Sequence, residues 1–320
     1  MKREAAALAL MLTMVAALAD DVPQGAAPAA SAPPSAKPVC TLPQIASLDM
    51  QTETSGLVTV PVTVDGVTGR WTVDTGNTGS MIGATIAIQQ KLRINSLRIP
   101  GVMMGGLPIR RYAIAPTVVF AGMHGSDVEL SIAPESILDN DTIGMLGPDI
   151  LQHYDIDFDF AAGKLNVFSP NHCPGKVIYW TKGTYAQVPF KLDGVGHITI
   201  PVMLDGKAMT AVVDTGAQGS AMSFATMNSL FGIDEKNPAL KPLGDIPINN
   251  MAPTPAYRYP FATLTFEGVQ VGTPNITVLK DTGMGDDAPE LLLGIETLRQ
   301  LHLYIAYGEG NIYVTPAEER

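Results

Sequence analysis

An internal repeat constrains the fold of this chain more than any other feature of its sequence. Residues 57–80 (LVTVPVTVDGVTGRWTVDTGNTGS) align without a gap with residues 197–220 (HITIPVMLDGKAMTAVVDTGAQGS), and eleven of the twenty-four positions are identical. A second pair of segments, residues 146–168 and 293–315, aligns in the same order. The chain therefore consists of two copies of one structural unit. The offset rises from 140 to 147 between the blocks, so the second copy carries seven extra residues, which we place in the Pro-rich segment 238–260.

The pattern within each copy predicts a mostly β structure. Short apolar runs rich in β-branched residues are separated by Gly, Pro, Asn and Asp, and few helical periods occur. With 46% hydrophobic residues, the 320-residue chain can form two medium-sized cores. We expect an N-terminal lobe over residues 41–172 and a C-terminal lobe over residues 173–320.

An aspartate is presented in the same way in both copies. A predicted buried strand runs into Asp-Thr-Gly at Asp74 and again at Asp214, and a Gly-Ser pair follows each motif. The tripeptide alone is weak evidence, because a third copy at Asp281 lacks the Gly-Ser pair. We interpret that third copy as a coincidence in a surface loop.

The paired motifs, each followed by an apolar-apolar-Gly segment (IGMLGPDIL and ELLLGIETL), resemble those of the retropepsin-like and pepsin-like aspartic endopeptidases. The resemblance covers about residues 55–315. It implies a bilobal acid-protease fold, with two duplicated β-barrel lobes and the active site in the cleft between them. It also implies that no cofactor is needed and that a monomer is sufficient for activity, since each lobe supplies one aspartate.

The resemblance further implies that Asp74 and Asp214 form a catalytic dyad. Two carboxylates about 3 Å apart cannot both ionise easily, so they share one proton. One then deprotonates a water while the other protonates the scissile carbonyl. The supporting loop residues would be Thr75, Gly76, Thr215 and Gly216.

Two further details follow from the resemblance. A flap over the cleft matches Met103, Met104, Gly105, Gly106 and Leu107, and the absence of a tyrosine there is nearer to the retropepsin type. Ala217 stands where the family often carries Ser or Thr. Without a hydroxyl to donate to the ionised carboxylate, we expect the pair to keep its proton to higher pH.

The N-terminus predicts an exported protein. Residues 1–19 combine a basic start, an apolar run and a small-x-small ending, which is typical of a signal peptide cleaved near Ala19. A retained membrane anchor is the alternative, although the apolar run is shorter than the ~20 residues of a spanning helix. Residues 20–40 are rich in Pro and Ala and are interpreted as a disordered tether. The expected location is the periplasm or the exterior.

The chain has only two cysteines, Cys40 and Cys173. In an exported chain we expect them to form a disulfide, with two unpaired thiols as the alternative. Two cysteines without neighbouring ligands do not form a zinc site, so no metal is expected.

Other candidate sites have simpler interpretations. A net charge of −11 argues against nucleic acid as a partner. Asp155, Asp157 and Asp159 imitate the start of a calcium loop, but the turn glycine and the final Glu are absent. Since they alternate with apolar residues, we expect them on the solvent-exposed face of a strand.

The sequence thus predicts an aspartic endopeptidase that acts on an extracytoplasmic protein or peptide; a membrane-anchored envelope protein is one substrate compatible with export. The alternative is an inactive descendant that serves as a peptide-binding or scaffold protein. Retention of both aspartates and both bracing glycines favours catalysis.

Overall fold

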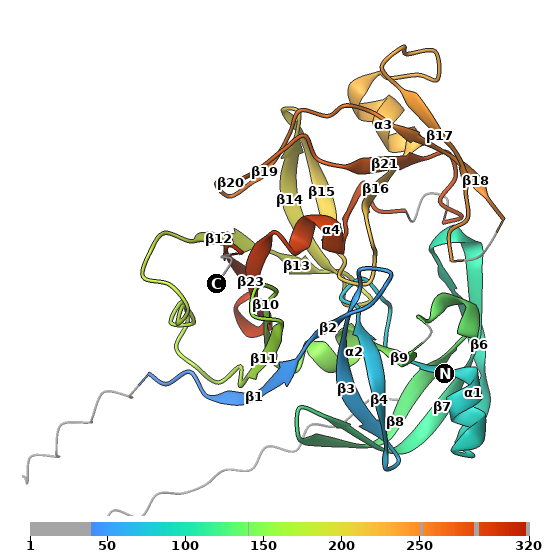
Figure 1. The fold of residues 1–320 in the computed structure, drawn as a ribbon, viewed down its shortest axis with the longest axis vertical. Helices are drawn as coiled ribbons and strands as arrows, with labels where there is room; N and C mark the ends of the chain where they lie inside the picture. The colour runs from blue at the N-terminus through green and yellow to red at the C-terminus, as the bar shows by residue number, and fades with distance from the viewer. Residues whose placement is uncertain (1–39, 140, 250–251, 285–287, 318–320) are drawn as a thin grey trace, which may run out of the picture. The chain divides into compact units, whose positions relative to one another are not determined.

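The computed structural model describes residues 40–139, 141–249, 252–284 and 288–317. The predicted signal peptide and all of the predicted tether except Cys40 lie outside these residues. The strands of the described residues form three sheets (Figure 1). The α-helices among them are short: α1 (Ala84–Gln89), α2 (Pro148–Leu151), α3 (Phe224–Phe231) and α4 (Ile295–Leu298).

The first sheet is built from the N-terminal copy. Its strands follow the order β2 (Gln51–Thr52), β3 (Val58–Val64), β4 (Val67–Val73), β9 (Thr142–Leu146), β5 (Met81–Gly83), β8 (Met123–Ala133), β7 (Leu107–Phe120) and β6 (Arg93–Met103). Because β3 also pairs with β7, the sheet closes on itself as a barrel.

The second sheet is built from the C-terminal copy. Its strands follow the order β17 (Lys241–Ile246), β18 (Thr254–Arg258), β21 (Ile276–Leu279), β16 (Ser220–Ser223), β22 (Leu291–Leu293), β15 (Lys207–Val213), β14 (Ile198–Leu204), β19 (Thr263–Phe266) and β20 (Val269–Gly272), and β13 (Lys191–Leu192) pairs with β14. This sheet remains open.

The two sheets repeat the same local structure. Asp65 and Asp205 each precede a glycine in the turn of a hairpin, and both aspartates have positive φ, 46° and 45°. Positive φ at both central residues is typical of the tight turns that join twisted antiparallel strands. The strand after each turn then pairs in parallel with the strand that leads into the second aligned block, β4 with β9 and β15 with β22. The predicted duplication and the mostly β fold are confirmed.

The third sheet combines strands from both copies. Its order is β1 (Gln44–Asp49), β11 (Lys164–Phe168), β10 (Asp155–Asp159), β23 (Leu301–Ala306), β24 (Asn311–Pro316) and β12 (Ala186–Pro189). The pairing of β10 with β23 joins the two copies through backbone hydrogen bonds. The boundary at residue 173 remains a prediction, because strands from both sides of it share this sheet.

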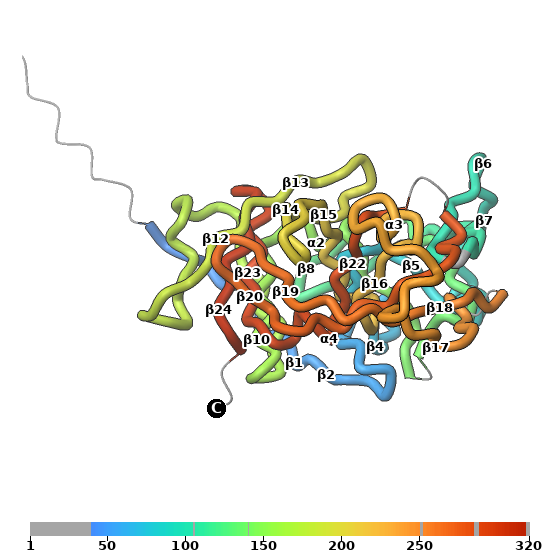
Figure 2. The backbone as a smooth tube through the Cα atoms, turned by 90° about the horizontal axis from the view of Figure 1, so that it is seen from above, coloured from blue at the N-terminus to red at the C-terminus, as the bar shows by residue number. Residues whose placement is uncertain are grey.

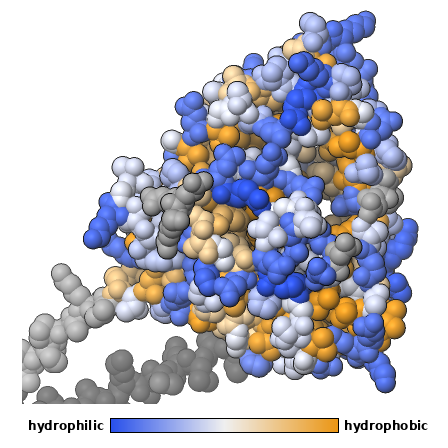
Figure 3. Space-filling model, viewed as in Figure 1, coloured by the Kyte–Doolittle hydropathy of each residue, from blue (hydrophilic) through white to orange (hydrophobic). Residues whose placement is uncertain are grey.

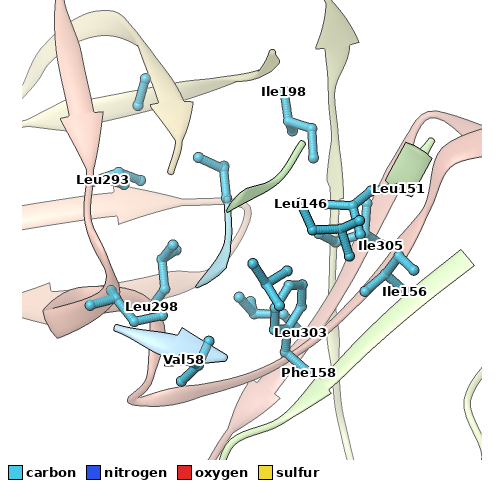
Figure 4. Close-up of a cluster of buried hydrophobic side chains, with 14 of the residues drawn as sticks. Val58, Leu146, Leu151, Ile156, Phe158, Ile198, Leu293, Leu298, Leu303 and Ile305 are labelled. Carbon is cyan, nitrogen blue, oxygen red and sulfur yellow. The ribbon is translucent and has the colours of Figure 1, made fainter. Parts of the chain in front are cut away.

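A continuous apolar core runs beneath this shared sheet. Figure 4 shows Leu146 and Leu151 of the first copy close to Ile305 of the second, and Leu303 beside Phe158. All of these side chains are buried. Burial of this kind is the main stabilising contribution to the fold.

The prediction for Asp155, Asp157 and Asp159 was wrong. All three are buried, because the segment that follows β11 covers the face of β10 that carries them and excludes solvent from it. His302 Nε2 lies 2.5 Å from Asp157 Oδ1, and His172 Nε2 lies 2.5 Å from Asp155 Oδ2. The alternation of polar and apolar residues correctly predicted that the apolar residues share one face of the strand. It did not show that the other face is buried too, because a strand buried on both faces has the same alternation when its polar residues have hydrogen-bond partners.

The covering segment is held by the predicted disulfide. Cys40 and Cys173 are bonded in the structure and are separated by 133 positions in the sequence. Trp180 of the same segment stacks on His302 with ring centroids 4.5 Å apart. The disulfide is consistent with an exported protein. Among the described residues, no helix is long and apolar enough to cross a membrane.

Candidate active site

The two Asp-Thr-Gly motifs lie at the ends of equivalent strands. Asp74 follows β4 and Asp214 follows β15. The amide of Asp74 donates to the carbonyl of Leu146 at 2.9 Å, and the amide of Asp214 donates to that of Leu293 at 3.0 Å. Each aspartate is thus held at the carboxyl end of a parallel strand pair.

Thr75 and Thr215 connect the two motifs. The Thr75 amide donates to Thr215 Oγ1, and the Thr215 amide donates to Thr75 Oγ1, both at 3.1 Å. The Thr75 hydroxyl donates to the Val213 carbonyl at 2.7 Å, and the Thr215 hydroxyl donates to the Val73 carbonyl at 2.6 Å. Four buried hydrogen bonds therefore fix one motif against the other.

Gly76 and Gly216 are required by the close approach of the motifs. A Cβ atom at Gly76 would lie 2.2 Å from Cγ of Asp214, and one at Gly216 would lie 2.1 Å from Cγ of Asp74. Each glycine amide also donates to the aspartate of its own motif, to Asp74 Oδ1 at 3.0 Å and to Asp214 Oδ1 at 2.8 Å. Any larger residue would displace the opposite carboxyl group.

The apolar-apolar-Gly segments brace the loops from behind. The amide of Gly147 donates to Ser80 Oγ at 2.9 Å, and that of Gly294 donates to Ser220 Oγ at 3.2 Å. Both serine hydroxyls are buried in these contacts and hold the loop geometry.

The two carboxyl groups interact directly. Asp74 and Asp214 are 4% and 8% exposed. Burial raises the pKa of Asp74 well above its usual range, and the charge of Asp214 and the hydrogen bond between the two carboxyls raise it further. Burial also raises the pKa of Asp214, although its hydrogen bonds with Gly216 and Asp74 lower it. One proton is therefore retained and shared by the pair.

A cleft of about 1170 Å³ opens over the two carboxyl groups, lined by residues of both copies. Met103 and Met104 line it from the β6–β7 hairpin, at the place predicted for the flap. Gly106 turns the hairpin with φ of 79°, and Leu107 is buried at the start of β7. The structure thus places the hairpin beside the cleft.

A second hairpin was missed from the sequence. The Pro-rich segment predicted to hold the extra residues contains β17 and β18, which form a hairpin at the same end of the molecule as β6 and β7 (Figures 1 and 2). The side chain of Asn249, between β17 and β18, donates to the Met104 carbonyl at 2.8 Å. Hydrophobic residues gather on the side of the molecule where these hairpins lie (Figure 3). In the repeat, this segment occupies the same position as the predicted flap of the first copy, and this correspondence could have indicated a second flap.

The third Asp-Thr-Gly copy does not contribute a carboxylate to the dyad. Asp281 is exposed, and its carboxylate accepts from the amide of Gly283 at 2.8 Å. Gly283 lies beside Gly106, where a Cβ atom would be 3.7 Å from the Gly283 carbonyl oxygen. This loop therefore supports the tip of the first hairpin. Among the described residues, no group of three or more His, Cys, Asp or Glu side chains could hold a metal ion.

A comparison with protein families agrees with this geometry. The family described as aspartyl protease matches residues 60–150 and 200–297, which include both motifs and both bracing glycines, Gly147 and Gly294. The structure is similar to that of basic 7S globulin from soybean, with 12% sequence identity, 87% of this chain and 96% of that chain covered, and a TM-score of 0.46. No curated protein matches the chain. Since the family match covers more than half of the chain, the chain belongs to the aspartyl protease family.

Proposed function

We propose that the chain is an aspartic endopeptidase that hydrolyses peptide bonds of an extracytoplasmic protein through Asp74 and Asp214. The observation that carries this proposal is the reciprocal bonding of Thr75 and Thr215, because it brings two buried carboxyl groups together at the floor of a cleft. A peptide-binding protein has no need for a pair of carboxyls whose pKa values are both raised.

The mechanism follows from the single proton that Asp74 and Asp214 share. The ionised carboxylate of the pair accepts a proton from a bound water while the water oxygen attacks the scissile carbonyl carbon. The protonated carboxyl donates its proton to the carbonyl oxygen, which gives a neutral diol intermediate. When the diol collapses, the amide nitrogen receives the proton taken from the water, one diol hydroxyl returns a proton to the carboxylate that had donated one, and the C–N bond breaks. No covalent enzyme intermediate forms.

The size of the cleft supports cleavage within a chain. It is lined by residues of both copies, among them Leu138 and Met145 of the first and Leu279 and Leu292 of the second. An extended peptide bound there would lie between the two copies, with its scissile bond over the carboxyl pair. The flap residues Met103 and Met104 would close over the peptide and exclude water.

We further propose that the protein acts after export, in the periplasm or outside the cell. The disulfide and the signal-like residues 1–19 support this location. A membrane-anchored envelope protein is a substrate that such an enzyme would meet. Both aspartates come from one chain, so a monomer has a complete dyad.

The proposal is tested with the purified mature protein and a proteome-derived peptide mixture. The wild type is expected to cleave peptides, whereas Asp74→Asn and Asp214→Asn are expected to lose cleavage and keep their melting temperatures near or above that of the wild type. Asp281→Asn is the matched control, because it makes the same change in the third motif and should cleave normally. If neither dyad substitution changes the cleavage pattern, the proposal is rejected. Binding without cleavage by the wild type would favour the inactive alternative.

A further inference from the structure

An arginine on the second hairpin stands out among the charged residues of the cleft. Arg258 ends strand β18 and lines the cleft with its half-buried side chain. Its Nε atom is buried and has no hydrogen-bond partner. Within the part of the chain that the structure describes, no carboxylate forms an ion pair with its guanidinium.

Other charged side chains that line the cleft have partners. Outside the dyad, they are Asp139 with the Ser55 hydroxyl, Asp193 with His197, Glu290 with Thr210, Glu296 with Asn275, and Arg299 with the Gly56 carbonyl. The Nε atom of Arg299 is also buried without a partner, but its Nη2 atom donates to the Gly56 carbonyl. Among the described charged residues of the cleft wall, Arg258 is thus the one whose whole charged group has no partner. A buried N–H without an acceptor costs free energy, so the site is complete only when an acceptor arrives.

The surroundings of Arg258 point its charge towards a peptide in the cleft. Arg258 pairs with Thr277 of β21, and Thr277 pairs with Ala221 of β16, so the three lie side by side across the sheet. All three line the cleft. Strand β16 begins six positions after Asp214, so this row forms the wall next to the catalytic carboxyl. On its other side Arg258 pairs with Lys241 of β17, which is also positively charged, so none of these strand neighbours offers an anion to its guanidinium.

The guanidinium is suited to one class of ligand. It presents its N–H donors in a planar fork that matches a carboxylate, and the bonds are strengthened by charge and by the partly desolvated wall. The chain as a whole is acidic, with a net charge of −11, and would otherwise disfavour acidic peptides. The positive charge of Arg258 would instead attract an acidic residue to the one position of the bound peptide that lies beside it.

We propose that Arg258 forms a subsite that binds the carboxylate of a substrate Asp or Glu, so that cleavage occurs at a fixed distance from an acidic residue. This inference rests on the proposed endopeptidase function and adds its substrate class. Arg258 would act in binding and specificity, since the reacting atoms are held by the dyad.

The test is a set of peptides based on one cleaved sequence, in which Glu or Gln is placed at each position around the scissile bond in turn. At one position, the wild type is expected to show kcat/KM about 10- to 100-fold higher for Glu than for Gln, as for a hydrogen bond to a charged group. Arg258→Gln should remove this ratio at that position only. Arg258→Lys should keep part of it, because the charge remains and the fork is lost.

Arg93→Gln is the matched control, because Arg93 is exposed on β6 and lies outside the cleft lining. It makes the same change in net charge and should keep the wild-type ratio. Thermal melting checks that Arg258→Gln is folded. In addition, Arg258→Glu should prefer Lys over Gln at the same position, which a folding defect cannot produce.

Equal rates for Glu and Gln at every position in the wild type would overturn the inference, as would an unchanged ratio in Arg258→Gln. These outcomes differ from failure of the proposed function, in which the wild type cleaves no peptide or Asp214→Asn cleaves as well as the wild type.

Discussion

Thr75 and Thr215 each donate a backbone amide to the hydroxyl of the other, at 3.1 Å in both directions. The contact joins residues 140 positions apart in the chain and lies directly beneath the two carboxyl groups. It makes the position of each aspartate depend on the opposite copy.

Removing one of these hydroxyls should therefore affect both stability and activity. Thr215→Val keeps the shape of the side chain but leaves the Thr75 amide and the Val73 carbonyl without a partner. We expect a loss of about 1–3 kcal/mol in the free energy of unfolding and a large drop in kcat. Thr215→Ser keeps the hydroxyl and should be much closer to the wild type. Urea unfolding and peptide hydrolysis measure both effects, and equal behaviour of the two variants would contradict the role of the hydroxyl.

The glycine beside each aspartate should be essential for activity. In Gly216→Ala, the new Cβ would meet Asp74 Cγ at 2.1 Å, so the carboxyl pair must separate. We expect kcat to fall by at least about 100-fold, as for a misplaced catalytic group. Gly219→Ala is the control in the same loop, because its nearest neighbour would be Glu296 Oε2 at 3.8 Å, an ordinary contact. An active Gly216→Ala enzyme would show that the carboxyls tolerate separation.

The dyad should destabilise the fold as the pH rises. Burial, reinforced by the charge of Asp214, raises the pKa of Asp74, so the folded state keeps a proton that the unfolded state loses above about pH 4. The free energy of unfolding then falls as the pH rises from there towards the raised pKa. Asp74→Asn removes this proton, so its melting temperature should exceed that of the wild type at neutral pH. The difference should shrink towards pH 4, whereas Asp281→Asn should follow the wild type throughout.

Ala217 offers a way to move the alkaline limb of the activity profile. Its amide donates to Asp214 Oδ1 at 3.0 Å, and its side chain adds no donor. In Ala217→Thr, a hydroxyl can donate to the ionised Asp214, which lowers the pKa of that carboxyl. Because a donor to the charged form favours loss of the proton that the pair shares, we expect the alkaline limb of kcat/KM to move to lower pH. Ala217→Val has the same shape without the hydroxyl, and a matching shift in that variant would exclude the hydrogen bond as the cause.

The buried pairs of the shared sheet should be important for stability. Asp157→Ala would leave His302 and the hydroxyl of Tyr179 without their carboxylate partner. We expect a loss of about 3–5 kcal/mol in the free energy of unfolding, as for other broken buried pairs. Lys164→Ala, which breaks the exposed contact with Asp49 on the neighbouring strand, should change stability little. Chemical denaturation compares the two variants.

Much of the site could be predicted from the sequence, because a duplication preserves local patterns. The strand, the Asp-Thr-Gly turn and the bracing glycine occur twice in the same order, and each depends on contacts that a repeat reveals. Asp74 and Asp214 could therefore be identified as a pair although they lie far apart in the sequence. The disulfide between Cys40 and Cys173 was expected from two cysteines in an exported chain, with two unpaired thiols as the alternative, and the structure contains the bond.

Only the tertiary structure decided which polar residues are buried and which hairpins face the cleft. The burial of Asp157 depends on a covering segment and on His302, which lies 145 positions away in the sequence. The alternation of polar and apolar residues along one strand cannot indicate such distant partners. The second hairpin could not be predicted from the Pro-rich segment, because β17 is defined by pairing with β18, and β18 by pairing with β21, and not by periodicity. Arg258 has a distinctive environment for the same reason, because the absence of a partner for its side chain is a property of the whole cleft and not of its neighbours in sequence.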